Sequence, residues 1–310
     1  MGKWSSFVLI ADMRTGSNLF EETIYQVSGA VCLGELFNPG FIGSAKNTSD
    51  VTPEMADRDE NPIGFWHDIK GQNAPLLVGF RYFNGHDQRI LSHVLHDESC
   101  AKIVLRRSPL DSFLSIKIAQ KTGQWRVRDE SRRRSSKVFF DPAEFDDYRM
   151  EQSLYYETVF DTLKATGQTA FILAFDDVLD LSVWKGLLRF LDLPHNELNT
   201  LGSLVRQNPE EPVEKVTNPQ DVAQYQRIYE HWSATVPQVA PRIDPLKVFV
   251  NEDSAKGFDL SNRFFEERLL SMQPGHSVLT QRQEIQDWQK LHPLHKVDFW
   301  LEHPLHRAYR

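Results

Sequence analysis

Five consecutive residues near the start of the chain have side chains or backbone freedom suited to binding an anion. They are Arg14, Thr15, Gly16, Ser17 and Asn18, and they follow shortly after the apolar run 7–11. An arginine supplies a charged fork for phosphate or sulfate oxygens, and a glycine lets the backbone turn tightly. The spacing differs from a Walker A loop, because residue 11 is alanine and Ser17 stands where that motif has lysine. The pattern predicts an anion-binding loop and disfavours Mg·ATP chemistry, with a plain turn and helix cap as the alternative.

A second group suited to an anion follows the apolar run 102–105. Arg107 stands at the end of that predicted strand, and Ser115 follows eight residues later. Ser108 and Pro109 between them form a strong helix start, an N-cap with proline at the first helical position. Ser115 then lies on the second turn of the predicted helix, close enough to Arg107 for the two side chains to bind one anion.

Short apolar runs alternate with helical spacings along the first two hundred residues and would position both groups. Strands are predicted at 7–11, 30–37, 76–80, 102–105 and 169–175, and helices at 17–27, 87–96, 109–121, 143–166 and 181–191. This alternation is typical of an α/β fold with a parallel sheet flanked by helices, in which ligands bind outside the carboxyl ends of the strands. The segment 38–75 is rich in Gly, Pro, Asn and Asp, which predicts a loop with one short helix.

The composition of the 310-residue chain is that of a globular protein with an excess of acidic residues. It has 35 Lys and Arg against 43 Asp and Glu, a formal net charge of −8, which argues against a non-specific nucleic-acid binder. Two cysteines, Cys32 and Cys100, are too few for a disulfide scaffold and indicate a reducing compartment. No apolar run approaches the roughly 20 residues of a membrane span, and none near the start has the form of a signal peptide. We therefore expect a cytoplasmic protein without a transmembrane segment.

The two anion-binding groups together resemble the family of sulfotransferases that use 3′-phosphoadenosine 5′-phosphosulfate (PAPS). In that family a strand–loop–helix near the N-terminus holds the 5′-phosphosulfate, a role that the resemblance gives to residues 14–18. A later arginine and a serine eight residues on hold the 3′-phosphate, and they are matched here by Arg107 and Ser115. Further similarity lies at 175–179, 188–193, 206–209 and 214–218. The last two segments resemble a loop that closes over the nucleotide, which adds Arg206 and Lys215 to the expected nucleotide-binding residues.

The resemblance covers roughly residues 5–225 and implies a P-loop-like sheet of the sulfotransferase fold. We expect a catalytic domain at 1–245 and a helical or irregular extension at 246–310 packed on the same domain. The family requires no metal, and the sequence has no His/Cys cluster with the spacing of metal ligands.

Residues 34–39 are similar to the bacterial branch of nodulation-factor and trehalose sulfotransferases, in which a glutamate after the second strand is the proposed base. Glu35 matches that glutamate, with a salt-bridge partner as the alternative. Animal cytosolic members use a histidine, and His86 is the corresponding candidate here, with a loop or helix-cap residue as the alternative. Arg14 replaces a lysine of the cytosolic enzymes and is expected to serve both catalysis and phosphosulfate binding. Arg81, at the same strand end as His86, is a further candidate for binding sulfate or substrate.

The resemblance implies transfer of a sulfuryl group from PAPS to a hydroxyl of a carbohydrate or glycolipid, with PAPS as co-substrate. A P-loop-type kinase and a catalytically inactive nucleotide-binding protein of the same fold are the alternatives. The basic run 126–137 fits a solvated helix face, a loop ordered by substrate, or a contact to an anionic or sugar acceptor. Trp125 beside it fits either stacking on a sugar ring or a place in the core. The sequence leaves the acceptor and the oligomeric state open, a homo-oligomer included.

Overall fold

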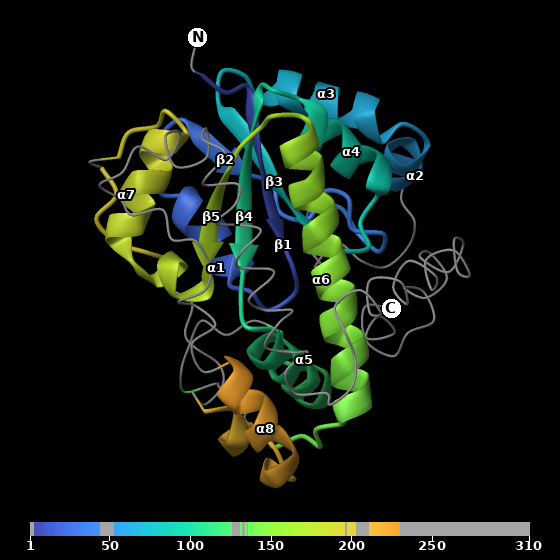
Figure 1. Ribbon diagram of the computed structural model, residues 1–310. Helices are drawn as coiled ribbons and strands as arrows, with labels where there is room; N and C mark the ends of the chain where they lie inside the picture. Colours follow the sequence, from blue (N-terminus) through green and yellow to red (C-terminus); the bar gives the residue numbers. More distant parts are fainter. Residues whose placement is uncertain are drawn as a thin grey trace.

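A sheet of five parallel strands forms the centre of the protein in the computed structural model (Figure 1). The model describes residues 3–43, 53–125, 131, 134, 136–195, 197–202 and 211–229. The strands are β1 (Ser6–Ala11), β2 (Ala30–Cys32), β3 (Leu77–Phe83), β4 (Cys100–Arg106) and β5 (Ala170–Ala174). They are ordered β2-β3-β1-β4-β5, and every neighbouring pair is parallel. The α/β class predicted from the alternation of strands and helices is therefore confirmed.

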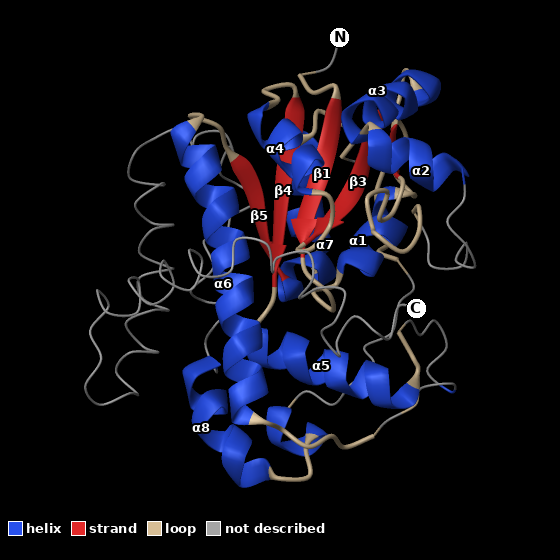
Figure 2. Cartoon of the chain, turned by 90° about the vertical axis from the view of Figure 1, so that its right-hand side faces the viewer, coloured by secondary structure: helices blue, strands red, loops and turns tan. Residues whose placement is uncertain are grey.

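Helices cover both faces of this sheet (Figures 1 and 2). One face carries α1 (Ser17–Ile24) and α7 (Leu181–Phe190), and the other carries α3 (Pro62–Asn73), α4 (Gln88–His96) and α6 (Pro142–Ala165). The helix α2 (Pro53–Glu60) contacts α3, and the 3₁₀ turns η3 (Phe175–Leu179) and η4 (Pro212–Lys215) contact α7 and α5. In both views α5 (Pro109–Thr122) and α8 (Pro219–Tyr229) lie beyond the carboxyl edge of the sheet, and α6 extends past that edge beside them.

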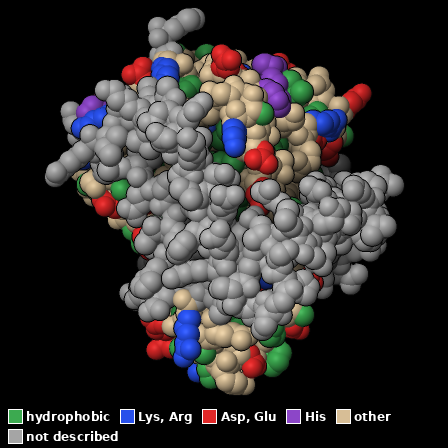
Figure 3. Space-filling model, viewed as in Figure 1, with side chains coloured by type: hydrophobic (Ala, Val, Ile, Leu, Met, Phe, Trp, Pro, Cys, Tyr) green, Lys and Arg blue, Asp and Glu red, His purple; other side chains and the backbone are tan. Residues whose placement is uncertain are grey.

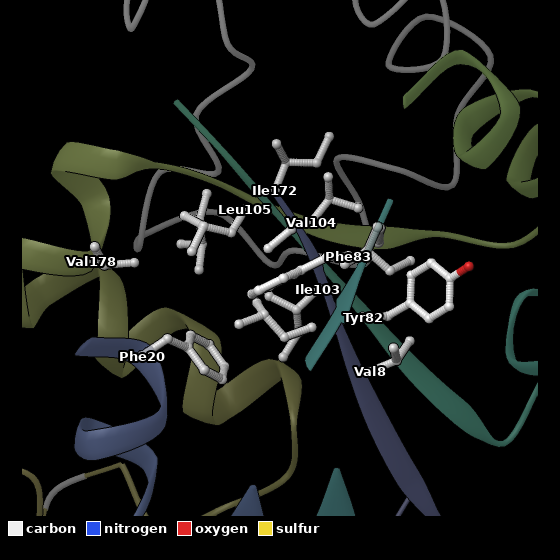
Figure 4. Packing of buried hydrophobic residues seen from close by; sticks show 14 of the residues in the cluster. Val8, Phe20, Tyr82, Phe83, Ile103, Val104, Leu105, Ile172 and Val178 are labelled. Atoms are coloured by element: carbon white, nitrogen blue, oxygen red, sulfur yellow. The ribbon is translucent and has the colours of Figure 1, made fainter. Parts of the chain in front are cut away.

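The strands are apolar because both faces of the sheet are covered. Every residue of β1, β3, β4 and β5 is buried. On one face Phe20 of α1 packs on Trp184 of α7, with ring centroids 5.0 Å apart. On the other face Trp66 of α3 packs on Phe80 of β3 at 4.8 Å. Figure 4 shows part of this core from close by, with Phe20 on one side of the strands and Tyr82 on the other.

The strand order reverses direction at β1, and this point marks the expected ligand edge. From β1 the chain crosses to β2 on one side of the sheet, and later strands add β4 and β5 on the other side. In open parallel sheets, ligands bind at the carboxyl ends of the strands where the order reverses. The loop after β1 therefore lies at the position that the topology favours for a ligand.

The largest differences from the predicted extents lie in the second strand and in the segment 38–75. The second strand was expected at 30–37, but β2 ends at Cys32 because Gly34, with φ 71°, turns the chain. The segment 38–75 was expected to hold one short helix, and its described residues, 38–43 and 53–75, hold two, α2 and α3. Proline stands in the first turn of each helix, and Asn61 caps α3 by accepting from the backbone N–H of Gly64. Residues that suggested a loop are therefore helix-start residues.

The surface of the described residues mixes both signs of charge. In the face shown in Figure 3, the visible Lys and Arg side chains are interspersed with Asp and Glu. The expected extension at 246–310 lies outside the described residues, as does most of the basic run 126–137.

Within the described part of the chain, no helix combines the length and apolar character that crossing a membrane requires.

Candidate functional site

The loop after β1 turns tightly at two residues with left-handed backbone. Arg14 has φ 64° and Gly16 has φ 100°, and such values are uncommon for a residue with a side chain. Gly16 also lies against η3, where an added Cβ would stand 3.1 Å from the Phe175 ring. Thr15 donates its hydroxyl hydrogen to the Asp12 carbonyl at 2.7 Å, inside the turn. Successive backbone N–H groups in such a turn, followed by a helix N-terminus, favour an anion.

The two predicted anion-binding groups meet at Arg14. Its Nε donates to the Ser115 hydroxyl at 3.0 Å, and its Nη1 donates to the Trp125 carbonyl. Arg107 donates from Nη1 to the backbone carbonyl of Arg14 at 2.9 Å, and its guanidinium lies 4.0 Å from the centroid of the Phe175 ring. The fold therefore places two guanidinium groups and a serine hydroxyl together at the carboxyl edge of β1 and β4.

Other basic residues near this edge of the sheet have different surroundings. The Lys215 Nζ lies 2.6 Å from Asp111 Oδ1, so η4 is paired with the first turn of α5, one turn before Ser115. Arg106 extends toward α6, with its guanidinium 5.1 Å from the centroid of the Tyr156 ring. Arg206 lies outside the described residues.

Arg81 of β3 connects the N-terminus of α1 with Glu35. Its Nη1 donates to Ser17 Oγ at 3.2 Å and to Asn18 Oδ1 at 2.9 Å. Its Nε lies 2.9 Å from Glu21 Oε2, and its Nη2 lies 3.4 Å from Glu35 Oε1. A buried guanidinium needs such carboxylate partners, because isolated charge is costly away from water.

Glu35 lies in the bend that follows β2. It pairs with Gly43 through an antiparallel bridge, and a Cβ at Gly34 would stand 2.2 Å from the Gly43 carbonyl oxygen. Asn38 donates from Nδ2 to Glu35 Oε2 at 2.8 Å, while its Oδ1 accepts from the Gly40 N–H at 2.9 Å. These bonds fix the Glu35 carboxylate at the edge of the sheet, beside the loop after β1.

Arg58 of α2 binds the backbone of the bend that carries Glu35. Its Nη1 donates to the carbonyls of Leu36, Asn38 and Phe41 at 3.1, 2.8 and 3.0 Å. The Arg58 side chain is buried and pairs with Asp59 at 2.6 Å. The segment 38–75 therefore supplies a support for Glu35 that the sequence did not reveal, because the helix predicted in this segment was not assigned to particular residues.

His86 lies beside Glu35, so the two candidate bases form one pair. The His86 Nε2 is 3.7 Å from Glu35 Oε2, and the Phe83 N–H donates to His86 Nδ1 at 3.2 Å. Burial lowers the pKa of His86 below its ordinary 6.5, although Glu35 opposes this shift. Burial alone would raise the pKa of Glu35, but His86, Arg81 and Asn38 outweigh it and keep that pKa below 4.5. At neutral pH the pair is an ionised carboxylate beside a neutral imidazole.

Sequence reasoning missed a buried polar group between β1 and α6. Asp12 follows β1 directly, and its Oδ2 accepts from Gln152 Nε2 at 3.1 Å and lies 3.4 Å from the Tyr148 hydroxyl. Burial raises the pKa of Asp12, and burial with the nearby charges of Asp12 and Asp147 raises the pKa of Glu151 to about 8. The available signal was the spacing of Tyr148 and Gln152 on one face of the helix predicted at 143–166.

The contact between Gly16 and η3 gives a stability prediction. Gly16→Ala is expected to cost about 1–2 kcal/mol for the left-handed backbone and about 1–3 kcal/mol more for the crowded Phe175 contact. Gly123→Ala is the matched control, because Gly123 also has positive φ but has no atom within 4 Å of an added Cβ. Urea unfolding of both variants checks this, and equal losses would contradict the packing argument.

Comparison of the chain with protein-family models, with curated proteins and with solved structures gave no match. Among the residues that the structure describes, no group of three or more His, Cys, Asp or Glu side chains could hold a metal ion.

Proposed function

We propose that the protein is a PAPS-dependent sulfotransferase of the P-loop-like sulfotransferase fold. The observation that carries the proposal is the convergence of Arg14, Arg107 and Ser115 at the carboxyl edge of the parallel sheet. These residues come from two separate sequence motifs. Arg14 is 93 positions from Arg107 and 101 positions from Ser115, and it contacts both. A nucleotide with two anionic ends needs two adjacent groups of donors, and the charge-assisted bonds of arginine suit both.

The loop after β1 would hold the 5′-phosphosulfate. Arg14 and the backbone N–H groups around Gly16 supply positive charge, and the N-terminus of α1 adds its dipole. Arg107 and Ser115 would hold the 3′-phosphate, since a serine hydroxyl can accept from Arg14 and donate to a phosphate oxygen at the same time. Lys215 lies one helical turn away, where its Nζ pairs with Asp111.

Glu35 would take the proton of the hydroxyl that attacks sulfur. The hydroxyl oxygen forms the new bond to sulfur, and the bond between sulfur and the oxygen of the 5′-phosphate breaks. The electron pair of that bond leaves with 3′,5′-adenosine bisphosphate, whose charge Arg14 would stabilise. By analogy with phosphoryl transfer, the protein would act mainly through positioning and charge stabilisation, without a covalent intermediate. The acceptor class, a hydroxyl of a carbohydrate or glycolipid, rests on the resemblance of residues 34–39.

Binding of 3′,5′-adenosine bisphosphate against Mg·ATP tests the proposal. The bisphosphate is expected to bind the full chain about 10²-fold more tightly or better, because two additional charge-assisted bonds contribute about 1.5–3 kcal/mol each. Isothermal titration calorimetry of the wild type gives both affinities. A preference for Mg·ATP would favour the kinase alternative. Binding of neither ligand would mean that the two motifs are ordinary capped helix starts.

A further inference from the structure

The two residues that sequence analysis offered as alternative bases have unequal freedom to accept a proton. The Nδ1 of His86 accepts the backbone N–H of Phe83 at 3.2 Å, so the ring lone pair at that nitrogen is occupied. A neutral imidazole that accepts at Nδ1 carries its hydrogen on Nε2. The Nε2 of His86 faces Glu35 Oε2 at 3.7 Å. The ring is further fixed by its own backbone, since the Tyr82 hydroxyl donates to the His86 carbonyl at 2.9 Å.

We infer that His86 is a positioning residue for Glu35, a neutral imidazole that directs its Nε2–H at the Glu35 carboxylate and leaves that carboxylate as the sole proton acceptor of the pair. The inference rests on the proposed function and assigns the roles that the proposal leaves open. It also follows the general arrangement of a base that is itself oriented by a third group.

The carboxylate side of the pair supports this assignment. Asn38 donates from Nδ2 to the same oxygen that His86 faces, and its orientation is set by the Gly40 N–H on Oδ1. Arg81 lies against the other oxygen at 3.4 Å. These three groups donate or carry positive charge, so all of them favour an ionised Glu35. A carboxylate has about four lone-pair positions, which leaves room for the hydrogen of an attacking hydroxyl.

Burial is the main reason that the imidazole stays neutral, because it lowers the pKa of His86 against the opposing effect of Glu35. Charged groups facing the pair are Arg81 from β3, Arg58 from α2 and Asp12 from the loop after β1, and Glu21 of α1 shares Arg81. The two guanidinium groups add to the effect of burial, since both lower the pKa of His86. Protonation at Nδ1 would also set a hydrogen against the Phe83 N–H. The adjacent Asp87 is paired with Arg89 at 2.6 Å.

Two variants separate a positioning role from a proton-accepting role. His86→Gln keeps an N–H donor at the place of Nε2, whereas His86→Asn keeps an oxygen at the place of Nδ1 and loses the donor toward Glu35. His86→Asn is expected to lower kcat about 10²-fold, the scale of a small misplacement of a reacting group, and His86→Gln is expected to stay within about tenfold of the wild type. Equal and complete loss in both variants would overturn the inference.

The pH profile of kcat also distinguishes the two roles. If His86 had only a structural role, its substitution would leave the acid limb of this profile at the same pH. In the wild type the acid limb should lie below 4.5, because Glu35 must be ionised and its pKa is lowered. His86→Asn should move this limb to higher pH, since loss of a donor raises the pKa of Glu35, and His86→Gln should leave it in place. A wild-type limb near 6.5 that disappears in both variants would show that His86 takes the proton itself.

Heteronuclear NMR of the ring nitrogens tests the inference without any acceptor substrate. The His86 signals, assigned by their loss in His86→Asn, should show hydrogen on Nε2 and none on Nδ1 at neutral pH, and this form should persist below pH 6.5. Hydrogen on Nδ1, or an imidazolium at neutral pH, would overturn the inference. Because this measurement needs no nucleotide, its failure is distinct from failure of bisphosphate binding, which would reject the proposed function.

Discussion

Replacing Arg107 with alanine is expected to weaken binding of 3′,5′-adenosine bisphosphate on the order of 10²-fold. The reason is the loss of a guanidinium that can make two charge-assisted bonds to one phosphate, each contributing about 1.5–3 kcal/mol, where 1.4 kcal/mol is a factor of ten. The side chain is already fixed on the Phe175 ring at 4.0 Å, so little ordering cost accompanies binding. Calorimetric titration of wild type and variant measures the difference.

Two further variants show whether the lost affinity belongs to the phosphate. Arg107→Lys keeps the charge and loses the planar fork, so its affinity should fall between wild type and alanine. Arg89→Ala removes a guanidinium that is half exposed and paired with Asp87, and it should leave the affinity unchanged. Unchanged affinity in Arg107→Ala would refute the assignment of the 3′-phosphate to this residue.

The arrangement of the fold was largely predictable because its local signals agree with one another. The helix predicted at 109–121 is observed as Pro109–Thr122, since Ser108 caps it and Gly123 ends it in left-handed conformation. The strand predicted at 102–105 lies inside β4, whose buried run is apolar except for its lysine and final arginine. The end of the second strand was predicted wrongly, because its strand-like composition continues past Gly34, where the chain turns.

The contacts within the candidate site were less predictable because they join distant residues. The sequence indicated that Arg14 and Ser115 each follow a strand, but their hydrogen bond depends on the strand order and on how α5 lies across the sheet edge. The contact of Glu35 with His86 depends on the bend that Arg58 contacts, and the sequence did not indicate that Arg58 would lie on a helix against that bend. The contact of Asp12 with Gln152 was not predicted either, because Gln152 comes from α6, 140 positions along the chain.

Arg81 connects the N-terminus of α1 with Glu35, and these contacts give a physical reason why the two lie close together. The same guanidinium contacts Ser17 and Asn18 at the start of α1 and Glu35 beyond β2. A change of charge on Glu35 therefore alters the field of a cation that contacts the loop proposed to hold the phosphosulfate. When the carboxylate accepts a proton, less of the charge of Arg81 is offset, and more is available to the developing charge on the leaving oxygens.

Glu35→Gln is expected to lower kcat for sulfuryl transfer about 10²–10⁴-fold, the usual contribution of a positioned general base. The affinity for 3′,5′-adenosine bisphosphate should stay unchanged, because Arg14, Arg107 and Ser115 are retained. The measurement is transfer of a radiolabelled sulfuryl group from PAPS to a panel of carbohydrates and glycolipids, followed on the one that the wild type modifies fastest. Calorimetry on the same preparations gives the affinity.

Glu21→Gln is the matched control for this loss. Glu21 also contacts Arg81, at 2.9 Å from Nε, so its substitution removes a carboxylate from the same guanidinium and leaves the proposed base in place. If activity depended on Arg81 having both of its carboxylate partners, Glu21→Gln and Glu35→Gln would lose activity to a similar extent. A large loss confined to Glu35→Gln, with nucleotide affinity intact, would come from the missing proton acceptor. Full activity in Glu35→Gln would exclude Glu35 as the base and, with it, the role inferred for His86.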